Sequence, residues 1–444
     1  MTMLCITSSK AFTIFTPEIR EALKAGPRHT KTPSIPLTLQ SALQSEDQSL
    51  FDAGFYHTAY DGVPQNRAKA LIHYVREGYL KGYNPSTDFD GAFYEKIYLK
   101  DWKGAWRGEP KNPLLHYLTE GRAKGAPAHP KFMKKPQPLE NPTYYLCLAA
   151  IFRDEARFLK EWIEYYLMMG VEHFFLTNHL SKDNYMEVLQ PYVDQGVVTL
   201  REEKEEKKSA AHRFQIQNRA YYHAVEWGVH NVDWLFICDT DEFLATYEED
   251  TFADLLRNYE DCAAASFHWK MFGMSNVQKL SSTDLLLEKM TKSSKSQDLH
   301  NRWFKTAFRP RCCNLPKTKH MQTLFHRPVL LKKFYSMDVK RNPLPFGAGM
   351  LPTYCSLPIP SDVARLHHYC FRDRFFLTNV KLKWIFRQKT IKSFLQKEKS
   401  WNVEVDTTMM RFVPELRRRM GLDAVTTPQE SADTEEVAPE PDAE

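Results

Sequence analysis

The fold of this 444-residue chain is decided by the stretch Asp233-Trp-Leu-Phe-Ile-Cys-Asp-Thr-Asp-Glu-Phe-Leu244. Its first half is a short apolar run, typical of a fully buried strand, and Asp239 and Asp241 follow directly. Ligands of open α/β sheets bind at the carboxyl ends of the strands. Two carboxylates one residue apart on a tight turn can face one cation, and Mg²⁺ and Mn²⁺ prefer oxygen ligands. The stretch therefore predicts a strand that ends in a cation site, with a pair of helix-capping aspartates as the alternative.

On both sides of this stretch, apolar segments alternate with amphipathic ones. Strands are predicted at 144–152, 173–177, 196–200, 233–238 and 263–269, and helices at 154–169, 185–193 and 214–227. The charged run 202–208 predicts a solvated loop or the start of a helix. Strands that alternate with helices imply right-handed crossovers, so we expect an α/β fold with a mostly parallel sheet and helices on both faces. After Ser281 the alternation weakens, and an irregular α+β region is expected.

An internal repeat precedes the α/β region. Phe51-Asp52, Phe55-Tyr56 and Tyr60 recur as Phe89-Asp90, Phe93-Tyr94 and Tyr98, and His73-Tyr74, Gly78 and Gly82 recur as His116-Tyr117, Gly121 and Gly125. Each copy predicts two short helices, the second of which stops at a glycine in a left-handed cap. The second copy is longer, which places an insertion at 102–111. Aromatic residues at helical spacing predict a shared core, and the repeated histidines are interpreted as structural.

Composition divides the chain into five parts. Residues 1–45 are predicted to be a poorly ordered leader, 46–130 a small helical repeat domain, and 131–142 a proline-containing linker. Residues 143–400 form the predicted catalytic domain. Residues 401–444 form a C-terminal segment, whose acidic end is predicted to be disordered.

Charge and cysteine usage restrict the partners and the compartment. The net charge of +5 comes without a basic run that contains interleaved aromatic residues, so nucleic acid is not expected as a partner. The eight cysteines include no Cys-x-x-Cys pair, which argues against a disulfide framework and a zinc site and fits a reducing compartment. We find neither an apolar run of ~18 residues nor a signal peptide. A cytoplasmic protein is expected, with peripheral docking on the inner face of a membrane left open.

Four blocks of sequence, in a fixed order, resemble the motifs of a known superfamily. They are Ile151-Phe-Arg-Asp-Glu155 with Glu161-Trp162-Ile163, Leu176-Thr-Asn-His-Leu-Ser-Lys-Asp183, Gln217 through Leu244, and Trp269-Lys-Met-Phe-Gly-Met-Ser275. Two later elements are Lys305-Thr-Ala-Phe-Arg-Pro310 and Leu366-His-His-Tyr369. Together they resemble the glycosyltransferase-A superfamily, specifically its family 2-like and family 92-like bacterial enzymes. Three positions depart from the motifs: Asp154 and His367 stand for asparagines, and Thr177 stands for an aspartate.

The resemblance implies a fold, a reaction and a set of site residues. The fold is a glycosyltransferase-A-like sheet, and the reaction moves a sugar from a nucleotide-diphosphate donor to a glycan or lipid-linked acceptor, in cell-surface polysaccharide synthesis. Glu155, Asp183, Asp239 and Lys305 would bind the nucleotide-sugar, and Asp239, Asp241 and His368 would hold Mn²⁺ or Mg²⁺. The metal would neutralise the leaving diphosphate. No residue is singled out as the catalytic base.

Each of these assignments has a structural alternative. Glu155 can be a surface acid, Asp183 a capping or turn residue, Lys305 an exposed lysine, and His368 a core histidine. For the whole chain, one alternative is a hydrolase that uses Asp241 and Glu242 as paired acids, although adjacent residues rarely face a bond from two sides. The other is a non-catalytic glycan-binding or scaffold protein with a degenerate transferase domain. The donor sugar, the acceptor, the linkage and the stereochemistry are not indicated by the sequence.

Overall fold

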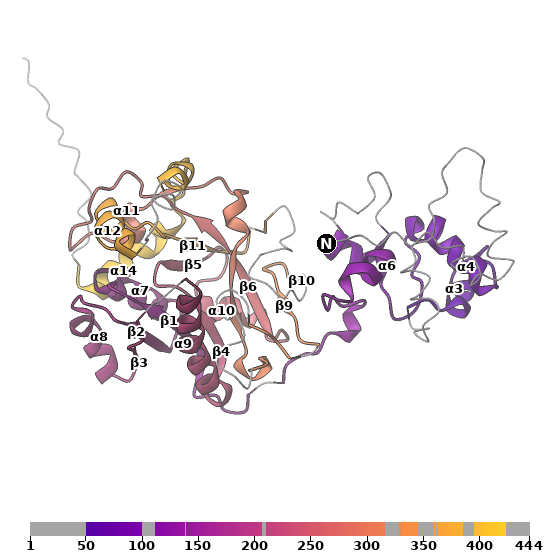
Figure 1. Cartoon of the computed structure of the whole chain (residues 1–444), viewed down its shortest axis with the longest axis horizontal. Coiled ribbons are helices and arrows are strands. Elements are labelled where there is room, and N and C mark those ends of the chain that lie inside the picture. The colour runs from indigo at the N-terminus through magenta and orange to yellow at the C-terminus, as the bar shows by residue number, and fades with distance from the viewer. Residues whose placement is uncertain are drawn as a thin grey trace, which may run out of the picture.

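The computed structural model of the chain describes residues 50–99, 112–137, 139–206, 210–315, 328–331, 333–344, 359–360, 362–384 and 395–422. A twisted sheet with helices on both of its faces dominates the molecule, and the repeats lie beside it (Figure 1). The described part contains no helix that is long and apolar enough to cross a membrane. Its six cysteines are buried free thiols.

The sheet has a parallel half and a mixed half. The parallel half consists of β3 (Val198–Glu203), β2 (His173–His179), β1 (Tyr144–Phe152) and β4 (Val232–Ile237), in that spatial order. Beyond β4 the order continues through β8 (Phe304–Phe308), β6 (Ala264–Met271), β9 (Ser336–Met337) and β10 (Pro343–Leu344). β8 is antiparallel to both β4 and β6. The predicted parallel α/β sheet is confirmed, and it is extended by strands from the region predicted as irregular.

Alternation along β1 explains why both faces carry helices. Side chains of a strand point to opposite faces in turn. Leu146 and Leu148 lie in the core under α7 (Ala156–Met168) and α8 (Tyr185–Asp194), whereas Cys147 and Ala149 lie in a second core under α9 (Ala210–Asn231). Strand β1 is therefore covered on both sides, as its continuous apolar sequence predicts.

Two predicted boundaries differ in an instructive way. Strand β3 runs on to Glu203 and takes in the start of the charged run that was expected to be a loop. β3 is at the edge of the sheet, so Arg201 and Glu202 are exposed to water, whereas the buried Glu203 carboxylate pairs with Arg219 at 2.8 Å. Helix α9 begins at Ala210 and ends at Asn231, and it is longer at both ends than predicted.

Two further strands pair with each other beside the carboxyl end of β4. Strand β5 (Glu242–Thr246) follows the two aspartates directly, where no strand was predicted. It pairs antiparallel with β11 (Ala364–His368), so that His368 lies opposite Glu242. β11 also pairs with β6. A segment more than a hundred residues away in sequence is thereby brought to the carboxyl end of β4.

The repeats form a small aromatic core of their own. Their helices are α3 (Ala53–Ala59), α4 (Arg67–His73), α5 (Gly91–Tyr94) and α6 (Pro113–His116). In each copy a buried tyrosine hydroxyl bonds to the Nδ1 atom of the repeated histidine, Tyr56 to His73 at 3.0 Å and Tyr94 to His116 at 2.8 Å. Gly82 and Gly125 are in the left-handed conformation, which confirms the predicted caps. The predicted insertion at 102–111 lies outside the described residues.

The C-terminal segment contributes to the main core. Helix α14 (Val413–Met420) packs against α7, and Val413 and Leu416 are buried in the same core as β1. The packing of the α/β domain thus extends past residue 400, where a boundary was predicted. The predicted leader at 1–45 and the acidic end from 423 lie outside the described residues.

Candidate functional site

The turn between β4 and β5 presents Asp239 and Asp241. The backbone N–H of Glu242 donates to the Asp239 carbonyl oxygen at 3.0 Å, and the Asp239 N–H donates to Glu242 Oε2 at 2.8 Å. These two bonds close a tight turn. A strand and not a helix follows it, so the interpretation of the two aspartates as helix caps is wrong.

Asp239 is held from two sides. Its Oδ2 atom accepts a hydrogen bond from Lys305 Nζ of β8 at 3.0 Å, and its Oδ1 atom accepts one from the Tyr221 hydroxyl of α9 at 3.3 Å. The Lys305 side chain is only 1% exposed, and its ammonium group also lies 3.6 Å from Glu242 Oε2. Burial alone would raise the pKa of Asp239, but the charge of Lys305 keeps it below its usual range. Lys305 therefore stabilises the turn through buried contacts to Asp239 and Glu242, and its side chain does not face solvent.

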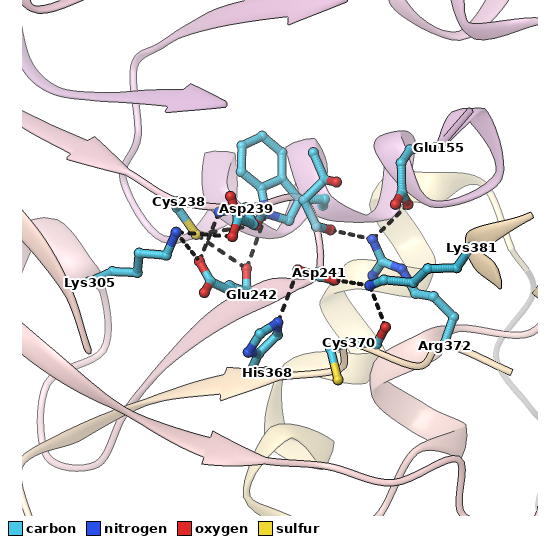
Figure 2. A network of polar contacts seen from close by, with 12 residues as sticks. Glu155, Cys238, Asp239, Asp241, Glu242, Lys305, His368, Cys370, Arg372 and Lys381 are labelled. Atoms are coloured by element: carbon cyan, nitrogen blue, oxygen red, sulfur yellow. Dashed lines mark hydrogen bonds and ion pairs between the residues drawn. The ribbon is translucent and has the colours of Figure 1, made fainter. Parts of the chain in front are cut away.

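Asp241 contacts two basic side chains, one at the end of β11 and one further along the chain (Figure 2). His368 Nε2 lies 3.3 Å from its Oδ1 atom, and Lys381 Nζ lies 2.9 Å from its Oδ2 atom. The Lys381 ammonium group also donates to the Cys370 carbonyl oxygen. Burial would raise the pKa of Asp241, but Lys381 and His368 hold it well below its usual range. The predicted meeting of Asp241 and His368 is present, with a lysine that was not predicted.

Glu155 joins the same network through a buried arginine. Arg372 donates to Glu155 Oε2 at 2.8 Å and to the Thr240 carbonyl oxygen at 2.8 Å. Its guanidinium group lies 4.5 Å from the ring centre of Phe158, and its Nε and Nη1 atoms have no hydrogen-bond partner in the described part of the chain. Burial raises the pKa of Glu155, and Arg372 opposes this. Glu155 is therefore a fixed member of the site and not a plain surface acid.

Asp183 occupies a neighbouring position with a structural contact. Its Oδ2 atom accepts the backbone N–H of Ala156, the first residue of α7, at 2.7 Å. The same loop is tied down next to it, because the N–H of Lys182 donates to Asp154 Oδ1 at 2.6 Å. The Asp183 bond satisfies a backbone donor at the start of α7, although Glu155 is the N-cap residue of that helix and Asn184 that of α8. It places the Asp183 carboxylate beside the residue that follows Glu155. Its predicted contact to the nucleotide stays a prediction.

Two residues of the network, Arg372 and Lys381, were missed from the sequence. They follow His368 in a region where the alternation of strands and helices has ended, and nothing in their local pattern separates them from the other 58 of 60 Lys and Arg residues. Only the antiparallel pairing of β11 with β5 brings them to Asp241. The block Leu366-His-His-Tyr369 was the one available signal, since it marks β11, the strand that precedes both residues.

This arrangement does not fit a divalent cation as it stands. Carboxylate oxygens and an imidazole are suitable ligands for Mn²⁺. However, both oxygens of Asp239 and both oxygens of Asp241 already have partners within the chain. The described residues also contain no group of three acids, histidines or cysteines placed to hold a metal. A metal at Asp241 would require the ammonium group of Lys381 to leave.

The fold and the site together define a class of protein. A sheet whose central parallel strand ends in Asp-x-Asp, beside a late strand that carries a histidine, is a glycosyltransferase-A-like domain. Residues 143–344 match the family model of glycosyltransferase family 92. This part of the chain is therefore a glycosyltransferase family 92 domain, in agreement with the resemblance of its motifs.

Relatives with the same family name share limited parts of the chain. A glycosyltransferase family 92 protein of Oryza sativa subsp. japonica is 28% identical over 164 residues, which are 35% of this chain and 26% of the relative. One of Ricinus communis is 35% identical over 49 residues, 11% of this chain and 9% of the relative. The match thus spans about a quarter of the rice relative's length.

Solved structures align only loosely. S. aureus TarS aligns with a TM-score of 0.31 and 8% identity over 57% of this chain and 42% of that chain. HddC from Yersinia pseudotuberculosis aligns with a TM-score of 0.26 and 11% identity over 44% of this chain and 90% of that chain. TM-scores this low support no inference about the site.

Proposed function

We propose that the chain is a glycosyltransferase that moves a sugar from a nucleoside-diphosphate donor to a glycan or lipid-linked acceptor. The observation that carries the proposal is the family 92 domain with an ordered Asp-Thr-Asp turn at the carboxyl end of its central strand. The leaving group of such a transfer is a nucleoside diphosphate, whose charge must be neutralised. Lys381 and Arg372 supply positive charge beside the turn, and Glu155 orients Arg372.

The finer parts of the prediction are proposals of the same kind. Mn²⁺ or Mg²⁺ on Asp239, Asp241 and His368 remains the expected cofactor if Lys381 can move aside. A role in cell-surface polysaccharide synthesis, a cytoplasmic location and docking at the inner face of a membrane are also expected. The catalytic base stays unassigned.

The first prediction concerns donor binding. Thermal unfolding of the whole chain is measured with UDP, GDP, dTDP and ADP, each with and without Mn²⁺. A ligand at 100 times its dissociation constant should stabilise the protein by ~2.7 kcal/mol. Asp241→Asn should abolish this effect, because it removes the carboxylate that holds His368 and Lys381. Asp194→Asn, at the exposed end of α8, is the matched control and should respond like the wild type.

The outcomes separate the alternatives. No stabilisation by any nucleotide would leave the non-catalytic glycan-binding protein as the better hypothesis, whereas an equal effect in Asp241→Asn would place the nucleotide elsewhere. The hydrolase alternative has little support, because the Glu242 side chain is fully buried and its Oε2 atom is bonded to the turn. It cannot approach a substrate bond together with Asp241.

A further inference from the structure

The ammonium group of Lys381 lies where a cation would bind Asp241. It contacts Asp241 Oδ2 at 2.9 Å and the Cys370 carbonyl oxygen, while His368 takes the other carboxylate oxygen (Figure 2). Two oxygen acceptors from separate parts of the chain thus converge on one positive charge. A divalent metal prefers the same hard oxygen ligands, so it and Lys381 compete for one place.

The acids around the turn already lie beside basic side chains of the protein itself. Three carboxylates are paired with three cations: Asp239 with Lys305, Asp241 with Lys381, and Glu155 with Arg372. The fourth acid, Glu242, is fully buried, and its Oε2 atom lies 3.6 Å from the Lys305 ammonium group. A divalent cation at Asp241 would therefore lie close to the positive charge of Lys381, which would repel it.

Lys381 is also the cation that a ligand can reach. Its side chain is 28% exposed, whereas those of Lys305 and Arg372 are 1% or less exposed. An ammonium group has three N–H donors, and within the described part of the chain two of them have acceptors. One donor is left for an oxygen from solvent, and phosphate oxygens form strong charge-assisted hydrogen bonds with lysine.

We propose that Lys381 is the resident cation of the Asp-x-Asp turn: it keeps a divalent metal from Asp241 in the donor-free protein, and the same ammonium group binds the diphosphate of the donor. The first half concerns the protein alone. The second half rests on the proposed function and is tested with a separate ligand.

The test uses the full chain and measures two affinities with opposite expected signs. Binding of Mn²⁺ alone is followed by electron paramagnetic resonance of the free ion, and binding of UDP in EDTA is followed by calorimetry. Lys381→Gln removes the charge and keeps an N–H donor on a side chain that is one bond shorter. It should bind Mn²⁺ roughly tenfold more tightly than the wild type, and it should bind UDP roughly tenfold more weakly. Lys381→Arg should stay close to the wild type in the Mn²⁺ experiment.

Two controls make the result specific. Lys289→Gln removes a half-exposed lysine that pairs with Asp284 away from the site, and should change neither affinity. Lys381→Gln combined with Asp241→Asn should lose the gained Mn²⁺ affinity. Circular dichroism of each variant confirms that it is folded.

Each remaining outcome contradicts a defined part of the proposal. If Mn²⁺ alone binds the wild type as tightly as Lys381→Gln, or binds neither, Lys381 does not keep the metal out. If UDP binds both equally well in EDTA, Lys381 does not bind the diphosphate. If neither UDP nor GDP, dTDP or ADP binds any variant under any condition, including added Mn²⁺, the proposed function fails, while the Mn²⁺ comparison still decides the first half.

Discussion

At the scale of single residues, Glu242 shows how burial turns an acid into a structural part of the site. Its Oε2 atom accepts the Asp239 N–H, and its Oε1 atom is buried with no hydrogen-bond partner in the described part of the chain. The sequence placed Glu242 beside the two aspartates but could not say that it points inward. Its carboxyl group, together with Lys305, stabilises the turn from the protein interior.

The raised pKa of Glu242 leads to a stability prediction. Burial moves its pKa from 4.5 to about 7, so between these values the folded protein binds more protons than the unfolded chain. The free energy of unfolding should then fall as the pH rises through this window and level off above it. The Glu242→Gln variant has no titrating carboxyl group at this position, so its free energy of unfolding lacks this fall with pH. Relative to the wild type it should gain up to about 3 kcal/mol between pH 4.5 and pH 8.

Urea unfolding at several pH values measures this difference. Loss of the contact to Lys305 adds an offset that does not depend on pH in this window, so only the slope is decisive. Glu140→Gln, which changes an exposed glutamate ahead of β1, is the control and should give a flat difference. A flat difference for Glu242→Gln as well would show that its carboxyl group titrates normally.

At the scale of elements, the strands divide into those with a clear local pattern and those without one. β1 is apolar along its whole length, β2 and β4 contain apolar runs, and the burial of these strands on both faces explains why they could be predicted. β5 has only five residues and begins within the acidic turn, so its pattern was taken as part of the motif. It becomes a strand because β11 supplies its hydrogen-bond partners.

The repeats contain a close approach that their glycines make possible. A Cβ atom added to Gly78 would lie 1.8 Å from the Tyr56 hydroxyl, and one added to Gly121 would lie 1.9 Å from that of Tyr94. Neither glycine is in the left-handed conformation. The sequence showed that these positions recur, but it suggested a helix cap. The structure shows that the absent side chain makes room for the tyrosine that bonds to the repeated histidine.

Gly78→Ala should therefore destabilise the first repeat, by about 1–3 kcal/mol, because the tyrosine must move from a well-packed position. Thermal unfolding of the full chain measures the change. Tyr56→Phe in the same chain removes the hydroxyl oxygen and should restore part of the loss. Gly91→Ala is the control, since its added Cβ atom would meet only ordinary contacts at 3.5 Å and beyond. If Gly78→Ala is as stable as the wild type, the close approach does not constrain the repeat.

At the scale of the whole molecule, the repeats and the α/β domain have separate hydrophobic cores. The buried cluster of the repeats lies within residues 50–128, and the two large clusters of the α/β domain begin at Leu146 and Cys147. The segment between them is fastened to the α/β domain, because the Lys134 N–H donates to the Lys333 carbonyl oxygen and Arg311 donates to that of Gln137. Both contacts involve residues of the predicted linker, 131–142.

A chain that begins at Lys131 should therefore fold and keep the nucleotide-dependent stabilisation of the full chain. Thermal unfolding with and without the best nucleotide measures both properties. Among the residues that the structure describes, none from the repeats belongs to the network around Asp239 and Asp241, so the size of the effect should be unchanged. A folded truncated chain without the effect would mean that the repeats form part of the binding site.

The sequence by itself determined what depends on local pattern: the parallel α/β sheet, the Asp-Thr-Asp turn at the end of β4, the paired repeats and the family. These features follow from residues that are neighbours along the chain or recur at a fixed spacing. Only the tertiary structure decided which charges meet at the turn. Lys305 comes from β8, 66 residues after Asp239, and Arg372 and Lys381 come from the chain after β11. The pairing of β8 with β4 and of β11 with β5 places them against the acids. The carboxylates of the predicted cation site therefore contact lysine side chains. No local pattern could indicate these contacts.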